Sequence, residues 1–153
     1  MSLTPLSYRP SFEENPKLAK ASHNLSSLLT AIGQKPITSR HVQKINEIIA
    51  EVNDFSGPDL ELVKQFKSAQ AGILKLLETD LQIVPKNHFQ SQWLGIGMAA
   101  IGLPFGVAFG AALGNMAFLG IGLPIGFGIG IAIGTAKDKQ VADEGRKLDW
   151  IAK

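Results

Sequence analysis

Two stretches of this chain have glycine at every fourth position, a pattern that allows helices to pack closely. "GLPFGVAFGAALG" starts at Gly102 and "GLPIGFGIGIAIG" starts at Gly122, with glycine, leucine and proline at the same offsets. A spacing of four places the glycines on one face of a helix. Without a side chain there, another backbone can approach closely. The residues predicted to pack helices or form a pore are Gly102, Gly106, Gly110, Gly114, Gly122, Gly126, Gly130 and Gly134.

A proline follows the first glycine of each stretch by two residues. Pro104 and Pro124 lack an N–H, so they free the carbonyls one turn back, at Ala100 and Gly120. We expect both prolines to kink their helices. A kinked helix that exposes carbonyls is better suited to lining water than lipid.

Enzymatic chemistry finds no support in the sequence. "GIGLPIG" from Gly120 is only superficially like a dinucleotide loop, because no strand precedes it and proline stands where the helix should begin. His23, His41 and His88 have no partner at metal-ligand spacing, and the chain has no cysteine. No serine or threonine lies in a nucleophile motif. We therefore expect no catalytic residue, cofactor, metal or enzymatic activity.

Charge divides the chain into three parts. Residues 87–136 contain no Asp, Glu, Lys or Arg, whereas both flanks are charged and the net charge is only +2. That small net charge gives no electrostatic reason to expect nucleic acid as a partner.

The uncharged middle predicts two membrane-spanning helices. About 20 apolar residues are needed to cross roughly 30 Å of hydrocarbon, and residues 93–113 and 116–136 each supply them. Asn115 is the polar side chain of the short connection, so a transmembrane hairpin over residues 93–136 turns there. A glycine-rich hairpin buried inside a larger soluble assembly is the alternative.

The flanking segments complete an all-α prediction. Residues 1–14, with Pro5 and Pro10, predict an extended arm. Asn15 and Pro16 are typical of a helix start, and apolar residues at helical spacing predict a bundle of three helices over residues 15–85. Residues 137–153 predict a charged, solvated tail, with Trp150 at the membrane interface.

The glycine rows also predict how copies of the chain associate. Two rows per hairpin would give each subunit two adhesive faces, which favours a homo-oligomer. The alternative is that the glycines only hold together the two helices of one hairpin.

On these residues the chain resembles the glycine-zipper pore-forming toxins of interbacterial competition, most of all the small membrane-depolarising effectors of type VI secretion. The resemblance covers residues 95–136 and rests on the two glycine rows with Pro104 and Pro124. It implies a pore in a target cell's inner membrane that dissipates the membrane potential. It also implies a secretion-tube carrier protein and a membrane immunity protein as partners.

Export without a signal peptide fits this resemblance, because the N-terminal residues lack a basic start followed by an apolar core. The many glycines lower the hydrophobicity of the two spans, because glycine has no side chain, and this would help the chain stay soluble before delivery. Two other functions remain open: a resident two-span or holin-like membrane protein, and an adaptor that the hairpin anchors to a membrane.

Overall fold

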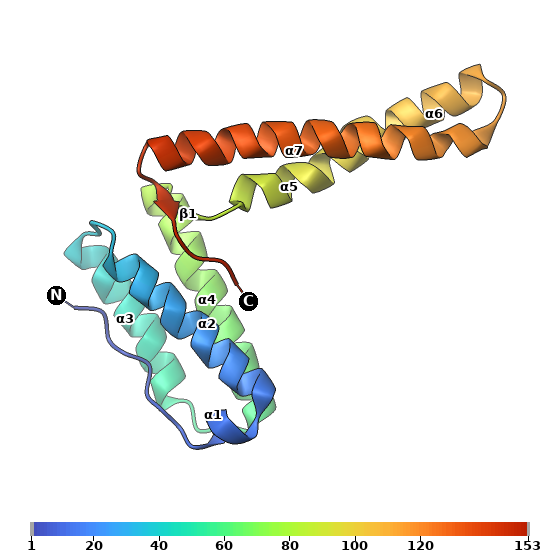
Figure 1. Ribbon diagram of the computed structural model, residues 1–153. Coiled ribbons are helices and arrows are strands. Elements are labelled where there is room, and N and C mark those ends of the chain that lie inside the picture. The colour runs from blue at the N-terminus through green and yellow to red at the C-terminus, as the bar shows by residue number, and fades with distance from the viewer. Residues whose placement is uncertain (1, 153) are drawn as a thin grey trace. The chain divides into compact units, whose positions relative to one another are not determined.

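The computed structural model describes residues 2–152, apart from the side chains of Ser11, Glu13 and Met116. The chain is all-α as predicted, with one pair of very short strands in its described part (Figure 1). It forms two compact units. We call Met1–Val84 with Leu148–Lys153 the helical unit, and Pro85–Lys147 the hairpin unit.

The helical unit contains α1 (Ser11–Glu14), α2 (Pro16–Gly33), α3 (Ser39–Asp54) and α4 (Asp59–Leu81). The side chain of Asn15 accepts a hydrogen bond from the Lys17 N–H at 3.1 Å, which confirms the predicted N-cap of α2. Apolar side chains at helical spacing on α2, α3 and α4 share one core. Those buried to less than 2% exposure include Leu18, Leu25, Leu28, Ile32, Ile45, Ile49 and Ile73.

Both ends of the chain differ from expectation. The arm is extended only to Arg9, and α1 follows it. The last residues are not a solvated tail, because Leu148 and Trp150 are buried in the core of the helical unit. The Trp150 indole donates a hydrogen bond to Ser27 Oγ at 3.0 Å. Trp150 therefore lies in a protein core rather than at a membrane interface.

The hairpin unit lies between two short paired strands, β1 (Val84–Pro85) and β2 (Lys147–Leu148). Its first limb consists of α5 (His88–Ile96), the π-helical segment η1 (Gly97–Gly102) and α6 (Leu103–Ala112). The 3-10 turn η2 (Met116–Phe118) leads into the second limb, α7 (Leu119–Asp143).

Both limbs are long and apolar enough to cross a membrane. The candidate spans are His88–Ala112 and Leu119–Asp143, each of 25 residues, or about 37 Å of helix at 1.5 Å per residue. The first starts before the predicted residue 93 and the second continues past residue 136. The first limb therefore gains a polar but uncharged turn of helix at its start, whereas the second continues into the charged residues after Ala136.

The two prolines sit in different helical surroundings. Before Pro104 the helix widens into η1, and the Leu103 N–H donates to the Met98 carbonyl five residues back. A π-helical turn relieves the clash that the proline ring would make with the carbonyl four residues earlier. Pro124 lies inside α7 without such a segment.

Candidate functional site

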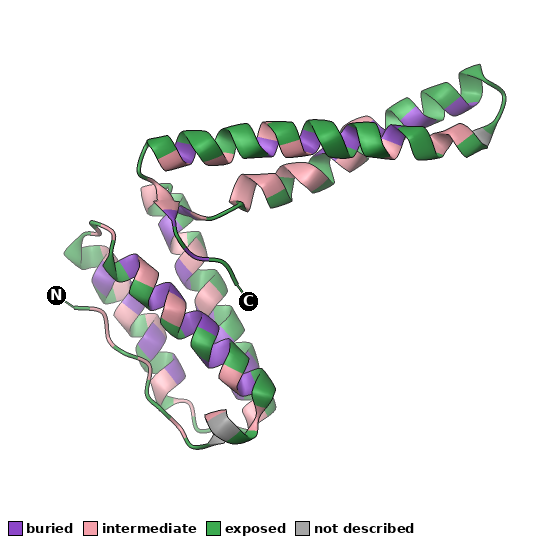
Figure 2. Ribbon diagram, viewed as in Figure 1, coloured by how far each residue is buried: buried purple, intermediate pink, exposed green. Residues whose placement is uncertain are grey.

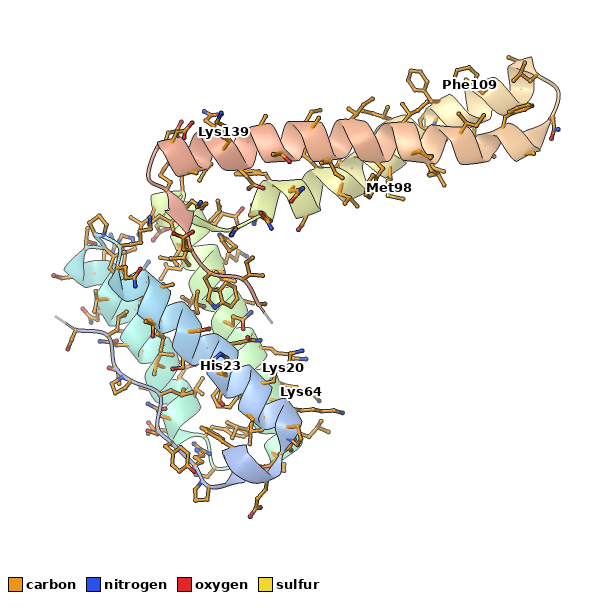
Figure 3. The ribbon with its side chains drawn as sticks, viewed as in Figure 1. Lys20, His23, Lys64, Met98, Phe109 and Lys139 are labelled. Carbon is orange, nitrogen blue, oxygen red and sulfur yellow. The ribbon has the colours of Figure 1, made fainter. Side chains whose placement is uncertain are left out.

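In the hairpin unit, scattered buried positions interrupt an otherwise mostly exposed or half-exposed chain (Figure 2). Among its described residues, those that are buried are one valine, Val141, and glycines. Ten large apolar side chains are between 37% and 57% exposed, and Figure 3 shows Phe109 projecting outward from α6. The buried glycines are Gly97, Gly102, Gly106, Gly110, Gly122, Gly126, Gly130 and Gly134.

These glycines are buried because the two limbs touch backbone to backbone. A β-carbon at Gly106 would lie 2.5 Å from the Leu119 carbonyl oxygen, and one at Gly126 would overlap the backbone of Gly97 and Gly102. No side chain can move aside to make room there, so only glycine fits. The positions at which a β-carbon would come within 3.0 Å of the other limb's backbone are Gly97, Gly102, Gly106, Gly122, Gly126, Gly130 and Gly134.

This packing settles a question that the sequence left open for the isolated chain. The row on the first limb faces the row on α7, so both rows are used within one hairpin. They are not two free adhesive faces. Gly97, which lies outside the predicted rows, belongs to the same contact, whereas a β-carbon at Gly95, Gly120 or Gly128 would meet nothing within 4 Å.

Gly114 and Asn115 form the turn rather than the packing face. Gly114 has φ +64°, in the left-handed region that favours glycine, and a β-carbon there would meet nothing within 4 Å. The Asn115 side chain accepts a hydrogen bond from the Ala117 N–H at 2.9 Å and so caps η2. Assigning Gly114 to the packing row was therefore wrong, and the hairpin turn expected at Asn115 is present.

On α7 the next position after the last glycine of the row carries a carboxylate. Asp138 follows Gly134 by four residues, and its two oxygens accept hydrogen bonds from the N–H groups of Phe89 and Gln90, at 3.0 and 2.9 Å. Asn87, the residue that precedes α5, makes no side-chain cap bond. Asp138 therefore caps α5 from the opposite limb, and its negative charge favours the positive end of that helix.

Sequence reasoning missed Asp138, which we had placed in a solvated tail. The available signal was its spacing, since it occupies the next four-residue step after Gly134. A residue on the packing face of α7 must meet the first limb, and at this level the first limb offers the unpaired N–H groups of a helix start.

Charged and aromatic side chains gather around this cap. The Lys137 ammonium lies 5.8 Å from the centre of the Phe89 ring and 5.5 Å from that of Trp93, which places it over both rings. Beyond the end of α7, hydrogen bonds from Arg146 and then Gln140 lower the pKa of the Glu144 carboxyl. The end of the hairpin unit opposite the turn, which we call its base, is thus polar and begins where the uncharged part of the chain ends.

Replacing Asp138 with alanine should loosen the base of the hairpin. The substitution leaves the Phe89 and Gln90 N–H groups without their charged acceptor, a loss of about 1.5–3 kcal/mol per such hydrogen bond. We expect amide hydrogen exchange at those two residues to accelerate by about tenfold or more. Asp143→Ala, at the exposed end of α7, is the matched control and should leave both amides unchanged. Equal protection in the two variants would contradict the capping role.

Each four-residue unit of the limbs has a small residue opposite its buried glycine. The units are Gly-Leu-Pro-Phe, Gly-Val-Ala-Phe and Gly-Ala-Ala-Leu on the first limb, and Gly-Leu-Pro-Ile, Gly-Phe-Gly-Ile and Gly-Ile-Ala-Ile on α7. The third residue of every unit is exposed. The members of this outer row are Pro104, Ala108, Ala112, Pro124, Gly128 and Ala132.

The exposed apolar side chains make the hairpin less stable in water than in hydrocarbon. Burying one large apolar side chain is worth about 1.5–3 kcal/mol, so leaving ten of them about half exposed to water forgoes on the order of 10 kcal/mol. That loss is comparable to the whole stability of a typical domain. In hydrocarbon these side chains no longer contact water, so this loss of free energy disappears. Hydrocarbon also favours helices, because all their backbone groups are paired.

The residues that the structure describes contain no group of three His, Cys, Asp or Glu side chains placed to hold a metal ion. No protein-family model matches the chain, and comparisons with curated proteins and with solved structures give no match. Its function is therefore inferred from the hairpin itself.

Proposed function

We propose that the chain inserts its hairpin into a lipid bilayer and that several copies associate there into an ion-conducting pore. The pore dissipates the membrane potential of the cell that receives it. The observation that carries this proposal is the exposure of large apolar side chains around a core of glycine. Such a hairpin is stable in hydrocarbon and costly in water.

The turn and the base favour entry of the hairpin as one unit. No charged residue lies between residues 87 and 136, so the turn at Asn115 crosses hydrocarbon without carrying an ion. The pairing of β1 with β2 holds the two ends of the hairpin next to each other. Both ends then stay on one side of the bilayer, with Asn115 on the other.

Conduction requires more than one copy, because glycine packing closes the space between the two limbs of one hairpin. Self-association therefore uses the outer surface. The outer row of Pro104, Ala108 and Ala112 allows close approach, and the equivalent row on α7 does the same. Pro124 leaves the Gly120 carbonyl without its usual helical donor, which gives a lining helix an oxygen to present to ions.

The setting follows from the resemblance to type VI effectors. The chain leaves a producer cell's cytoplasm with a secretion-tube carrier protein and acts in the target cell's inner membrane. A membrane immunity protein protects the producer. The carrier covers the exposed apolar side chains until delivery, since they are costly in water.

One observation favours a second function. Because both glycine rows are used inside the hairpin, the hairpin is also a self-sufficient anchor. In that case the helical unit binds a partner, and the chain is an adaptor that conducts nothing.

Purified full-length chain added to liposomes with a potassium gradient separates these functions. A pore collapses the membrane potential, reported by a potential-sensitive dye, and the initial rate rises more steeply than linearly with the amount of bound protein. Chain that binds the liposomes quantitatively and leaves the potential intact would reject the pore and support the adaptor.

A further inference from the structure

The N-terminal arm, residues 2–9, is held on α3 by two asparagines that bind its backbone. The Asn46 side chain accepts from the Thr4 N–H at 2.8 Å and donates to the Ser2 carbonyl at 3.1 Å. The Asn53 side chain accepts from the Ser7 N–H at 2.9 Å and donates to the Pro5 carbonyl at 3.2 Å. Each asparagine thus makes the same two bonds, one repeat apart.

The spacing of the bonded groups along the arm is close to the spacing of the two asparagines along α3. The bonded groups of the arm recur every three residues, which is the period of a polyproline II helix and corresponds to about 9.3 Å. Asn46 and Asn53 are seven residues apart on α3, two turns of helix or about 10.5 Å. An extended peptide with a three-residue period therefore keeps its register along α3.

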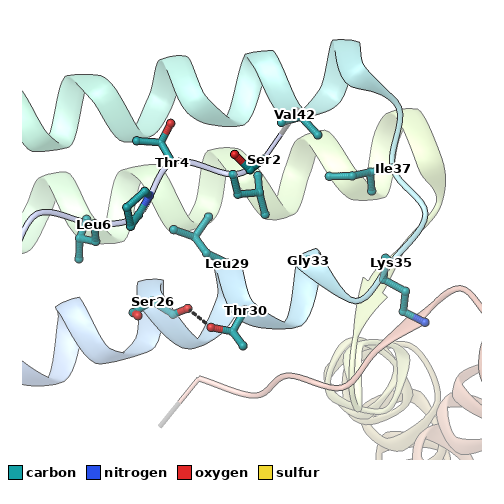
Figure 4. Close-up of a pocket in the computed structure, with 12 residues that line it drawn as sticks. Ser2, Thr4, Leu6, Ser26, Leu29, Thr30, Gly33, Lys35, Ile37 and Val42 are labelled. Carbon is teal, nitrogen blue, oxygen red and sulfur yellow. Dashed lines mark hydrogen bonds between the residues drawn. The ribbon is translucent and has the colours of Figure 1, made fainter.

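Apolar contacts follow the same period. Leu3 and Leu6, three residues apart, pack against the core of the helical unit. Beside them a hollow of about 550 Å³ remains, with Leu29, Ile37 and Val42 among its apolar lining residues (Figure 4). The arm does not fill the surface on which it lies.

Arg9 makes the last hydrogen bonds between the arm and α3, at the C-terminal end of the helix. Its guanidinium donates to the carbonyl oxygens of Val52 and Asn53, at 3.3 and 2.7 Å. These are among the last carbonyls of α3, which have no partner within the helix. Nearly all polar contacts of the arm are thus made by or to backbone groups, and they need an extended chain rather than a particular fold.

We infer that α3 is a binding site for an extended peptide of this kind, and that in the membrane-bound assembly its occupant is the arm of a second copy of the chain. This inference rests on the self-association proposed above. The arm of another copy presents the same carbonyls, N–H groups and leucines, so exchange conserves every contact. The asparagine pair would then link neighbouring helical units.

The occupant is a second copy because the arm itself is the peptide whose fit the structure establishes. Membrane-bound copies are confined to two dimensions, which raises the effective concentration of a neighbour's arm. The arm joins the helical unit through Pro10 and the four-residue helix α1. Exchange therefore requires no unfolding of α2, α3 or α4.

Cross-linking of full-length chains tests the exchange, since the chain has no cysteine of its own. One chain carries Ser7→Cys, beside the arm's bond to Asn53, and a second chain carries Ala50→Cys, one turn from Asn53 on α3. Both positions are exposed. The two chains are mixed in the same liposomes and treated with a short thiol-reactive linker. We expect a covalent heterodimer.

The control removes the asparagines from both chains. Asn46→Ala with Asn53→Ala then eliminates the four hydrogen bonds that hold any arm on α3, its own or a neighbour's, and should lower the heterodimer yield by about tenfold or more. Asn46→Asp with Asn53→Asp still accepts but cannot donate, and should give an intermediate yield. Circular dichroism verifies that both variants fold.

Absence of the heterodimer, or an equal yield from the alanine variant, overturns the exchange. Dye depolarisation measured in the same liposomes separates this failure from that of the pore. A conducting sample without heterodimer rejects exchange alone, whereas heterodimer without conduction rejects the pore and leaves the exchange standing.

Discussion

A methyl group added at Gly126 should separate the two limbs of the hairpin, whereas the same change two residues later should not. In Gly126→Ala the new β-carbon falls on the backbone of Gly97 and Gly102, which cannot move aside. Overpacking of this kind costs about 1–3 kcal/mol or more. In Gly128→Ala the β-carbon meets nothing within 4 Å, and alanine is the better helix former.

The measurement is the distance between spin labels on the two limbs in liposomes, together with the rate of depolarisation. For Gly126→Ala we expect a longer, broader distance distribution and a loss of conductance of about tenfold or more. The double variant Gly106→Leu with Gly126→Leu should conduct nothing, while still binding membranes because leucine is more apolar. Full activity in that double variant would mean that glycine packing is not needed for the pore.

Alanine at these positions distinguishes packing within one hairpin from packing between subunits. If the glycines faced other subunits through a flexible contact, a methyl group would have an intermediate effect. The structure instead places each β-carbon on a backbone atom, so alanine and leucine at Gly126 should both open the hairpin.

The second large effect is expected at the other end of the chain, at Trp150. Its side chain is 6% exposed in the core of the helical unit. Replacing a buried tryptophan with alanine costs about 3–5 kcal/mol, a large share of the 5–15 kcal/mol that stabilises a typical domain. Urea unfolding of full-length chain in mild detergent, followed by circular dichroism, should show the midpoint fall accordingly.

Ile151 supplies the matched control, because it is the next residue and is 49% exposed. Ile151→Ala should change the free energy of unfolding by no more than about 0.5 kcal/mol. Trp150→Phe keeps an aromatic ring but loses the bond to Ser27, worth about 1 kcal/mol. If Trp150→Ala unfolds at the same urea concentration as Ile151→Ala, the last residues do not belong to the core of the helical unit.

Periodicity predicted the helices well because each signal was local. The start of α2 could be placed from Asn15 and Pro16, since a cap depends only on residues within one turn. The two apolar limbs and the turn at Asn115 followed from length, hydropathy and the lack of charge. These properties do not depend on what the helices contact.

The candidate site was only half predicted, for the opposite reason. Spacing placed Gly102 and Gly122 on helix faces, but it could not say whether those faces meet each other or another copy. Asp138 and Trp150 were assigned to a charged tail because their neighbours are polar. Both owe their positions to partners more than forty residues away, at Phe89 and Ser27.

Composition and spacing are enough to establish that this chain is helical, that its middle is uncharged and apolar, and that glycine recurs on one face of each limb. That the two glycine faces pack against each other, with large side chains exposed around them, follows only from the folded arrangement of the limbs. A four-residue repeat defines a face but not its partner, because any smooth backbone surface can approach glycine. The partner is chosen by chain connectivity, since the short turn at Gly114 and Asn115 brings the two rows together.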